Sequence, residues 1–227
     1  MGQEKIVFIG GMGEGLGTAL AHYFLAKDYQ VIGFNRSVNN KVRKEILQMN
    51  VDLSDQNQVR EALAQTQLAL RAPDVFIHNA AELVIAPFQE TTVEQFEQCW
   101  KAIALSAFIL SKELLPLMAV KGGTAIFTGA TASIRGGNNF SAFSSAKFAL
   151  RGLVQSLARQ YQNLGVHVAH VLVDGIINTE RSRELHRLPV EKMLDPQHIA
   201  ECYWQLCQQP ESTWTHELDI RPSTEKF

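Results

Sequence analysis

Short apolar runs and stretches of helical spacing alternate along the whole chain. The apolar runs predict seven strands, near residues 5–9, 30–34, 48–51, 74–78, 123–129, 166–173 and 216–220. The intervening patterns predict helices near 15–28, 39–47, 55–70, 92–119, 141–164, 180–187 and 196–208. Such alternation is typical of a parallel sheet with helices on both faces. Because no linker, repeat or low-complexity tract interrupts it, residues 1–227 are predicted to form a single, doubly wound α/β domain.

A glycine-rich loop joins the first predicted strand to the first predicted helix. Five glycines lie between Gly10 and Gly17, and the helical pattern starts at Leu16. Glycine permits a tight turn and lets backbone N–H groups approach phosphates, while the helix N-terminus favours an anion. Strand, glycine loop and helix in this order predict a dinucleotide site that includes Gly11, Gly15, Leu16 and Gly17.

The end of the second strand indicates which dinucleotide binds. An NAD site usually has an acidic residue there to hold the ribose hydroxyls. Here the strand ends in Asn35-Arg36-Ser37. Arg36 can pair with a 2′-phosphate, which favours NADP(H) over NAD(H). The alternative is that Arg36 is an ordinary surface arginine, and Glu14 in the glycine loop favours it, because the negative charge of Glu14 would repel a 2′-phosphate that it faced.

Two further strand ends carry candidate cofactor contacts. Asp52 and Leu53 follow the third strand, and Asp52 can accept a hydrogen bond from an adenine amino group. The alternative is a loop aspartate, with Ser54 capping the next helix. The fourth strand ends in Asn79-Ala80-Ala81, whose small residues would let the backbone lie against the cofactor. The alternative there is a tight strand exit.

Composition and charge narrow the range of partners. The net charge is −2 and the pI is near 6.4, and the scattered basic residues argue against a nucleic-acid partner. The longest apolar run, Ala102–Ser111, is shorter than the ~18 residues of a membrane span. The N-terminus shows no signal-peptide pattern. We therefore expect a cytoplasmic protein without a membrane partner.

The spacing of cysteines and histidines predicts no metal site. Cys99, Cys202 and Cys207 match no metal motif, and the seven histidines form no paired-ligand pattern. Reduced thiols are expected.

Taken together, the motifs resemble the short-chain dehydrogenase/reductase family. Gly11-x-x-x-Gly15-Leu16-Gly17, Asp52-Leu53 and Asn79-Ala80-Ala81 match its cofactor motifs in order, the last with alanine for glycine. Residues 173–179 look like its Pro-Gly-x-x-x-Thr segment, with Asp174 for the proline. The resemblance implies a seven-stranded Rossmann-type sheet and subunits joined by helices into a homodimer or homotetramer. It also assigns cofactor contacts to Gly175, Ile177 and Thr179.

The catalytic positions of that family are mostly altered here. Its Tyr-x-x-x-Lys pair aligns with Phe143 and Lys147, its serine with Ala130 and its asparagine with Ala104. In the family, the tyrosine moves a proton to or from the substrate oxygen, and the lysine lowers the tyrosine pKa and holds the nicotinamide ribose. Three of the four positions therefore lack a capable side chain, and Phe143 has no proton to give.

Several roles stay open at this altered site. Lys147 can act as a ribose anchor or, with a depressed pKa, as a substitute acid. Thr131, Ser133 and Asp174 are other candidate proton donors. Phe143 and the two alanines could instead form an apolar pocket for a different ligand.

The function predicted from these features is an NAD(P)-dependent oxidoreductase. It would transfer a hydride between NADPH and a small carbonyl or alcohol substrate at a non-standard catalytic site. The alternative is a catalytically silent dinucleotide sensor or partner subunit. The basic residues from Arg181 to His186 slightly favour an acidic or polar substrate, although a solvated helix face explains them too.

Apolar side chains on the two longest helices predict self-association. The six residues concerned lie on faces that cannot all point inward. They are Phe108, Leu114, Leu117, Leu150, Leu153 and Leu157. A homodimer or homotetramer is therefore expected from the residues as well as from the resemblance.

Overall fold

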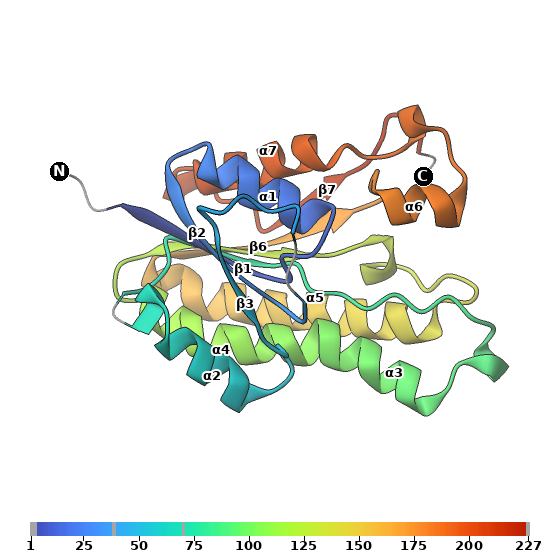
Figure 1. The fold of residues 1–227 in the computed structure, drawn as a ribbon, viewed down its shortest axis with the longest axis horizontal. Helices are drawn as coiled ribbons and strands as arrows, with labels where there is room; N and C mark the ends of the chain where they lie inside the picture. Colours follow the sequence, from blue (N-terminus) through green and yellow to red (C-terminus); the bar gives the residue numbers. More distant parts are fainter. Residues whose placement is uncertain (1–3, 38–39, 70, 226–227) are drawn as a thin grey trace.

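A single seven-stranded sheet forms the centre of the molecule (Figure 1). The computed structural model describes residues 4–37, 40–69 and 71–225. All strand pairs are parallel and the order is β3-β2-β1-β4-β5-β6-β7, which confirms the predicted α/β fold class. The strands are β1 Lys5–Gly10, β2 Tyr29–Asn35, β3 Leu47–Asn50, β4 Val75–His78, β5 Gly123–Thr128, β6 Val166–Val173 and β7 Glu217–Ile220.

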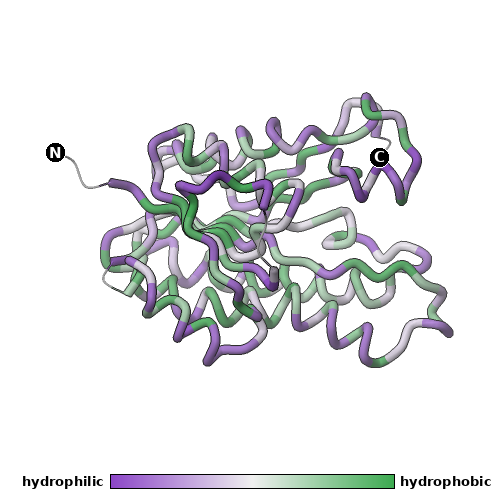
Figure 2. The backbone as a smooth tube through the Cα atoms, in the orientation of Figure 1, coloured by the Kyte–Doolittle hydropathy of each residue, from purple (hydrophilic) through white to green (hydrophobic). Residues whose placement is uncertain are grey.

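Helices cover both faces of this sheet. The α-helices are α1 Leu16–Leu25, α2 Gln56–Ala64, α3 Val93–Trp100, α4 Ser106–Met118, α5 Ser141–Tyr161, α6 Glu180–His186 and α7 Pro196–Cys207. Figure 1 shows α1, α6 and α7 on one side and α2 to α5 on the other. The central strands form a largely hydrophobic region (Figure 2), as expected where a parallel sheet is buried on both faces, whereas the edge strands β3 and β7 are partly exposed.

Aromatic side chains on neighbouring strands fill the core on the α2–α5 side. Phe8 packs edge-on against Phe34 with ring centroids 4.9 Å apart, and Phe76 packs against Phe127 at 5.5 Å. All four rings are fully buried. Such edge-to-face pairs each add about 0.5–1.5 kcal/mol beyond the burial of their area. This core fixes the strands whose carboxyl ends carry the candidate site.

The predicted helix at 39–47 is wrong. Residue 39 lies outside the described residues, and residues 40–46 form turns that lead into β3. Val42 and Ile46 are spaced like a helical pair, but both are buried in the α1/α7 core from a non-helical backbone. β-Branched residues beside Asn40 have little intrinsic helix propensity, so tertiary burial decides the conformation.

The predicted helix at 92–119 is interrupted. Its start is capped, because the Thr92 hydroxyl accepts from the Gln95 N–H and the Gln95 side chain accepts from the Thr92 N–H. A π-helical turn at Lys101–Leu105 then separates α3 from α4. The Ser106 hydroxyl donates to the Ala102 carbonyl at 2.7 Å. Helical turns of this kind are often found at functional sites.

The helix faces expected to drive self-association differ in exposure. Leu114 and Leu150 are wholly buried, so these two belong to the core and not to a free surface. Phe108 and Leu117 are exposed, while Leu153 and Leu157 are partly buried against the core. Across the described residues, no helix has the length and apolar character required to cross a membrane.

Candidate functional site

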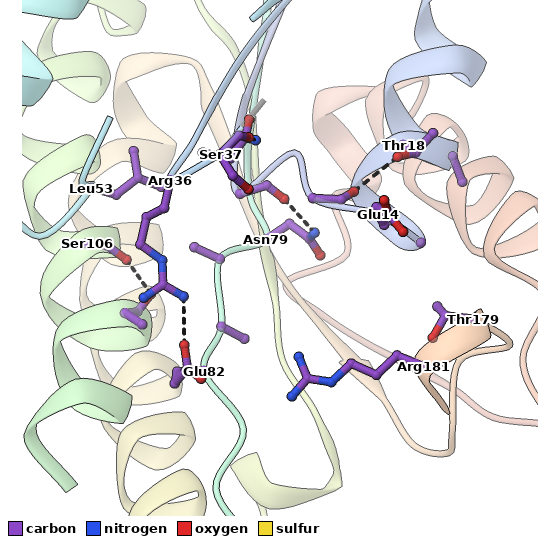
Figure 3. Close-up of a pocket in the computed structure, with 18 of the residues that line it drawn as sticks. Glu14, Thr18, Arg36, Ser37, Leu53, Asn79, Glu82, Ser106, Thr179 and Arg181 are labelled. Atoms are coloured by element: carbon purple, nitrogen blue, oxygen red, sulfur yellow. Dashed lines mark hydrogen bonds and ion pairs between the residues drawn. The ribbon is translucent and has the colours of Figure 1, made fainter. Parts of the chain in front are cut away.

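A cleft of about 1130 Å³ opens at the carboxyl ends of the central strands (Figure 3). Its walls come from the loops that follow β1, β2, β3 and β4 and from the start of α6. The strand order reverses between β1 and β4, and ligands of open α/β sheets bind at such a switch point. The sheet therefore places the predicted motifs around one space.

The glycine loop has room only for glycine at two of its positions. Gly11 and Gly15 both have φ of 91°, which L side chains rarely adopt. A Cβ at Gly11 would lie 2.5 Å from the Ala80 Cα, and one at Gly15 would lie 2.5 Å from the Thr179 Cγ2. The loop is thus packed directly against the chain after β4 and the chain before α6.

Residues beyond the motif hold this loop in place. Met12 is fully buried, and a Cβ on Gly33 in β2 would overlap its side chain. A Cβ on Gly17 would lie 2.8 Å from the Gly11 carbonyl oxygen, so α1 packs tightly against the loop. Neither Met12 nor Gly33 is predicted from the sequence, since their pairing joins positions 21 residues apart.

Asn79 links the glycine loop to the neighbouring strand. Its amide donates to the Gly11 carbonyl at 3.0 Å, and its Oδ1 accepts from the Thr128 hydroxyl at 3.1 Å. Thr128 also shares a 2.8 Å hydrogen bond with the buried Tyr203 hydroxyl. Ala80 and Ala81 line the cleft beside Asn79, as their small size predicts.

Arg36 reaches across the cleft mouth to an acidic partner. Its guanidinium lies 2.7 Å from the Glu82 carboxylate, and the Arg36 side chain is 66% exposed (Figure 3). Lys41 lies 2.8 Å from Glu14 and 3.1 Å from Glu180. The negative charge of Glu14 is therefore opposed by a lysine. Neither Glu82 nor Lys41 is predicted from the sequence, because each partner comes from a distant loop.

Asp52 forms a local turn at the edge of the cleft. One carboxylate oxygen accepts from the Ser54 N–H and hydroxyl at 2.9 and 2.8 Å. Asp52 and Leu53 both line the cleft. The expectation that Ser54 caps the next helix is wrong, because Asp55 accepts from the Asn57 and Gln58 N–H groups at the start of α2. A carboxylate binds those N–H groups with charge assistance, which a serine lacks.

Lys147 is buried and is not part of the described cleft lining. Its ammonium donates to the Thr128 carbonyl at 2.7 Å, and the half-buried Phe143 ring centroid is 5.6 Å from its Nζ. Burial lowers the Lys147 pKa to about 8. The two residues are one helical turn apart on one face of α5, as their spacing predicts.

The other candidate proton donors, Thr131, Ser133 and Asp174, lie outside the described cleft lining. Thr131 donates to Asp174, whose other carboxylate oxygen lies 3.2 Å from Arg221. The buried Ser133 hydroxyl accepts from the Ala130 N–H at 3.1 Å. Ala104 lies buried in the π-helical turn. Phe143, Ala130 and Ala104 have no proton to give, so Lys147 carries the one acidic group among the four positions that align with the family's catalytic residues.

A buried hydrogen-bonded pair, His78 and Ser106, lies near Lys147. His78 at the end of β4 is hydrogen-bonded through Nε2 to the Ser106 hydroxyl at 2.8 Å, and Ser106 lines the cleft. Burial, with the nearby Lys147 charge, lowers the His78 pKa to about 3, so the ring is neutral. Sequence reasoning missed this pair, because Ser106 follows an irregular turn that no simple periodicity reveals.

The structure brings most of the predicted cofactor residues to one surface. The cleft lining includes Gly11, Gly15, Asn35, Arg36, Asp52, Leu53, Asn79, Ala80, Ala81 and Thr179. The described lining does not include Leu16, Gly17, Lys147, Gly175 or Ile177. Leu16 and Gly17 are buried at the start of α1. Across the described residues, no group of three His, Cys, Asp or Glu could hold a metal ion.

We expect Lys147→Met to stabilise the protein at neutral pH. The folded pKa of about 8 is below the ordinary 10.5, so burying the charge costs about 3 kcal/mol. The Lys147→Met variant also loses the hydrogen bond to the Thr128 carbonyl, which reduces its gain in stability by about 1 kcal/mol. Between pH 8 and 10.5 the unfolded chain holds a proton that the native lysine lacks, so the unmodified protein gains stability from this group as pH rises.

The advantage of Lys147→Met should therefore shrink across that window. Urea unfolding of both proteins at pH 7, 9 and 10.5 measures the difference. An advantage independent of pH would show that the buried ammonium is not its source.

Known proteins share this fold. A model of the family described as short chain dehydrogenase matches residues 5–188. A solved short-chain dehydrogenase from Rhodopseudomonas palustris is 32% identical, with a TM-score of 0.80, covering 97% of this chain and 100% of that one. An alcohol dehydrogenase from Thermococcus sibiricus, complexed with 5-hydroxy-NADP, is 22% identical, with a TM-score of 0.88 and 99% of each chain covered.

The chain also resembles one part of a longer curated protein. The uncharacterized oxidoreductase YuxG of Bacillus subtilis is 25% identical over 187 residues, or 77% of this chain. The chain spans only 27% of that protein. Because the family model covers well over half of the chain, and a solved member aligns with it almost from end to end, this chain belongs to the short-chain dehydrogenase family.

Proposed function

We propose that the protein is an oxidoreductase that transfers a hydride between NADPH and a small carbonyl or alcohol substrate. The observation that carries this proposal is a single cleft lined by the glycine loop, Asp52, Asn79 and Arg36. Its volume of about 1130 Å³ slightly exceeds the usual range of about 300–1,000 Å³ for ligand sites, so it is large enough for a dinucleotide. The residues fit a dinucleotide, because Gly11 and Gly15 leave a backbone cradle that a Cβ would fill.

Each part of a dinucleotide has a candidate partner in this chain. The glycine loop and the α1 N-terminus would hold the pyrophosphate. Asp52 would accept from the adenine amino group, and Arg36 would bind the 2′-phosphate. Gly175, Ile177 and Thr179, in the loop after β6, would contact the nicotinamide end. The bound nicotinamide supplies or accepts the hydride, and the Thermococcus sibiricus relative was solved with 5-hydroxy-NADP.

Lys147 is assigned the role of ribose anchor. Its ammonium is directed at the Thr128 carbonyl and covered by the Phe143 ring, which suits a fixed cation better than a proton donor. Without a general acid, carbonyl reduction should run ~10²–10⁴-fold more slowly than with one. An oriented cofactor would keep hydride transfer possible.

The unmodified protein should bind NADPH more tightly than NADH. The exposed Arg36 guanidinium can leave Glu82 for a 2′-phosphate, and a charge-assisted bond of about 1.5–3 kcal/mol gives about 10-fold or more. Arg36→Asp should reverse the preference. Fluorescence titration with both nucleotides measures it.

Glu82→Gln serves as the matched control for this preference. It removes the competing carboxylate, so it should tighten NADPH binding and leave NADH binding unchanged. Equal affinities in the unmodified protein, or tighter NADH binding, would contradict the assignment of Arg36.

We also expect the chain to form a homodimer or homotetramer. Large apolar side chains on α3, α4 and α5 are exposed, including Phe96 at 43%, Phe108 at 50% and Phe148 at 45%. A monomer rarely leaves a large apolar patch uncovered. Light scattering at micromolar concentration should give two or four times the chain mass of 25.3 kDa. A 25 kDa particle would contradict this expectation.

A further inference from the structure

Four cationic side chains line the cleft, and they differ in their partners. Arg36 pairs with Glu82, Lys41 with Glu14 and Glu180, and Lys101 with Glu97. Arg181, in the first turn of α6, has no acidic partner among the residues that the structure describes. Figure 3 shows its side chain extending from α6 into the open space of the cleft. An arginine in this situation has its full hydrogen-bonding capacity available.

The base of Arg181 is fixed beside the glycine loop. The Thr179 methyl packs so close to Gly15 that a Cβ there would lie 2.5 Å away. Thr179 also caps α6 by accepting from the Ser182 N–H at 3.0 Å. Lys41 bridges Glu14 of the loop and Glu180 of the helix. Two contacts, one through Thr179 and one through Lys41, therefore attach the start of α6 to the glycine loop. Arg181 is the next residue along the helix.

We propose that Arg181, held beside the glycine loop, binds the pyrophosphate of the dinucleotide. The inference rests on the function proposed above. Glycine-loop N–H groups and the α1 N-terminus favour an anion, α1 has no acidic residue in its first turn, and the charge of Glu14 in the loop is opposed by Lys41. The planar guanidinium can pair with two phosphate oxygens at once. Arg36 would hold the 2′-phosphate, so the two arginines have separate tasks.

The same anionic chemistry could come from a substrate carboxylate. The pyrophosphate is favoured because the attachments of Arg181 are to the glycine loop, through Thr179 and Lys41. A pyrophosphate is common to NADPH and NADH, whereas the 2′-phosphate belongs to NADPH alone. Binding measurements with the two nucleotides can therefore separate the roles of Arg181 and Arg36.

The test compares Arg181→Gln with Arg183→Gln. Arg183 lies on the same exposed helix, donates to Asn178 at 2.7 Å and is absent from the described cleft lining, so it is a matched control. We expect Arg181→Gln to weaken NADPH and NADH binding by the same factor, about 10-fold or more, from the loss of charge-assisted bonds. Binding of 2′-AMP, which has no pyrophosphate, should be unchanged. Arg183→Gln should bind all three ligands like the unmodified protein.

Three results would overturn the inference in distinguishable ways. Unchanged binding of both dinucleotides to Arg181→Gln, with tight binding to the unmodified protein, would remove the role of Arg181 and leave the proposed function standing. An effect confined to the KM of carboxylate-bearing carbonyl substrates would reassign Arg181 to the substrate. Failure of the unmodified protein to bind either dinucleotide would refute the proposed function itself.

Discussion

Phe143→Tyr combined with Ala130→Ser is expected to raise carbonyl reduction with NADPH by ~10²-fold or more. The new phenol would occupy the ring position 5.6 Å from the Lys147 ammonium, which favours the deprotonated phenol and so lowers its pKa toward neutrality. The serine hydroxyl would orient the substrate oxygen from the loop after β5. Steady-state NADPH oxidation against a panel of carbonyl compounds measures the gain.

Phe148→Tyr provides the control for this pair of substitutions. Phe148 lies on the same helix but is 45% exposed, so a hydroxyl there adds the same group away from Lys147. It should leave the rate unchanged. If the double variant gains nothing or loses native activity, the site has been rebuilt for another ligand or mechanism, or serves a silent dinucleotide-binding protein.

Gly11→Ala is expected to destabilise the protein and to abolish tight cofactor binding. Its φ of 91° costs an L residue about 1–3 kcal/mol, and the added Cβ would meet the backbone of Ala80, which cannot rotate away. Relief requires the glycine loop to separate from the chain after β4, which would break the Asn79 bond to the Gly11 carbonyl. Thermal unfolding and NADPH titration measure both effects.

Gly13→Ala is the matched control within the same loop. A Cβ at Gly13 would have no atom within 4 Å, so the free protein should unfold at the same temperature as the unmodified one. Equal stability of the Gly11 and Gly13 variants would show that the glycine loop is less tightly packed than the structure indicates.

The sequence predicts the fold well because its signals are local and repeated. The central strands are apolar runs bounded by polar turns, and the seven strands alternate with helical patterns, so few arrangements other than a parallel sheet bury the apolar runs. The failed helix at 39–47 shows the limit of periodicity. Val42 and Ile46 are spaced for a helix, yet burial against α1 and α7 is reached equally well from turns.

The sequence also predicts part of the cofactor cleft. The cofactor motifs lie at strand ends, and parallel strands bring their carboxyl ends to one edge of the sheet. Residues that act through partners far along the chain are not predicted. Glu82 faces Arg36 across 46 residues, and Lys41 pairs with Glu14 across 27 residues and with Glu180 across 139. The substitution of Phe143 is visible in the sequence, but which group moves a proton in its place depends on contacts that no motif encodes.

The crystal structure of the protein with NADPH tests the central claim most directly. The structure should place the pyrophosphate on the loop at residues 11–15, the 2′-phosphate on Arg36 and the nicotinamide against the Phe143 ring, with the ribose near Lys147. A dinucleotide bound elsewhere, or a nicotinamide remote from Phe143, would contradict the assignment of this cleft as the site of hydride transfer.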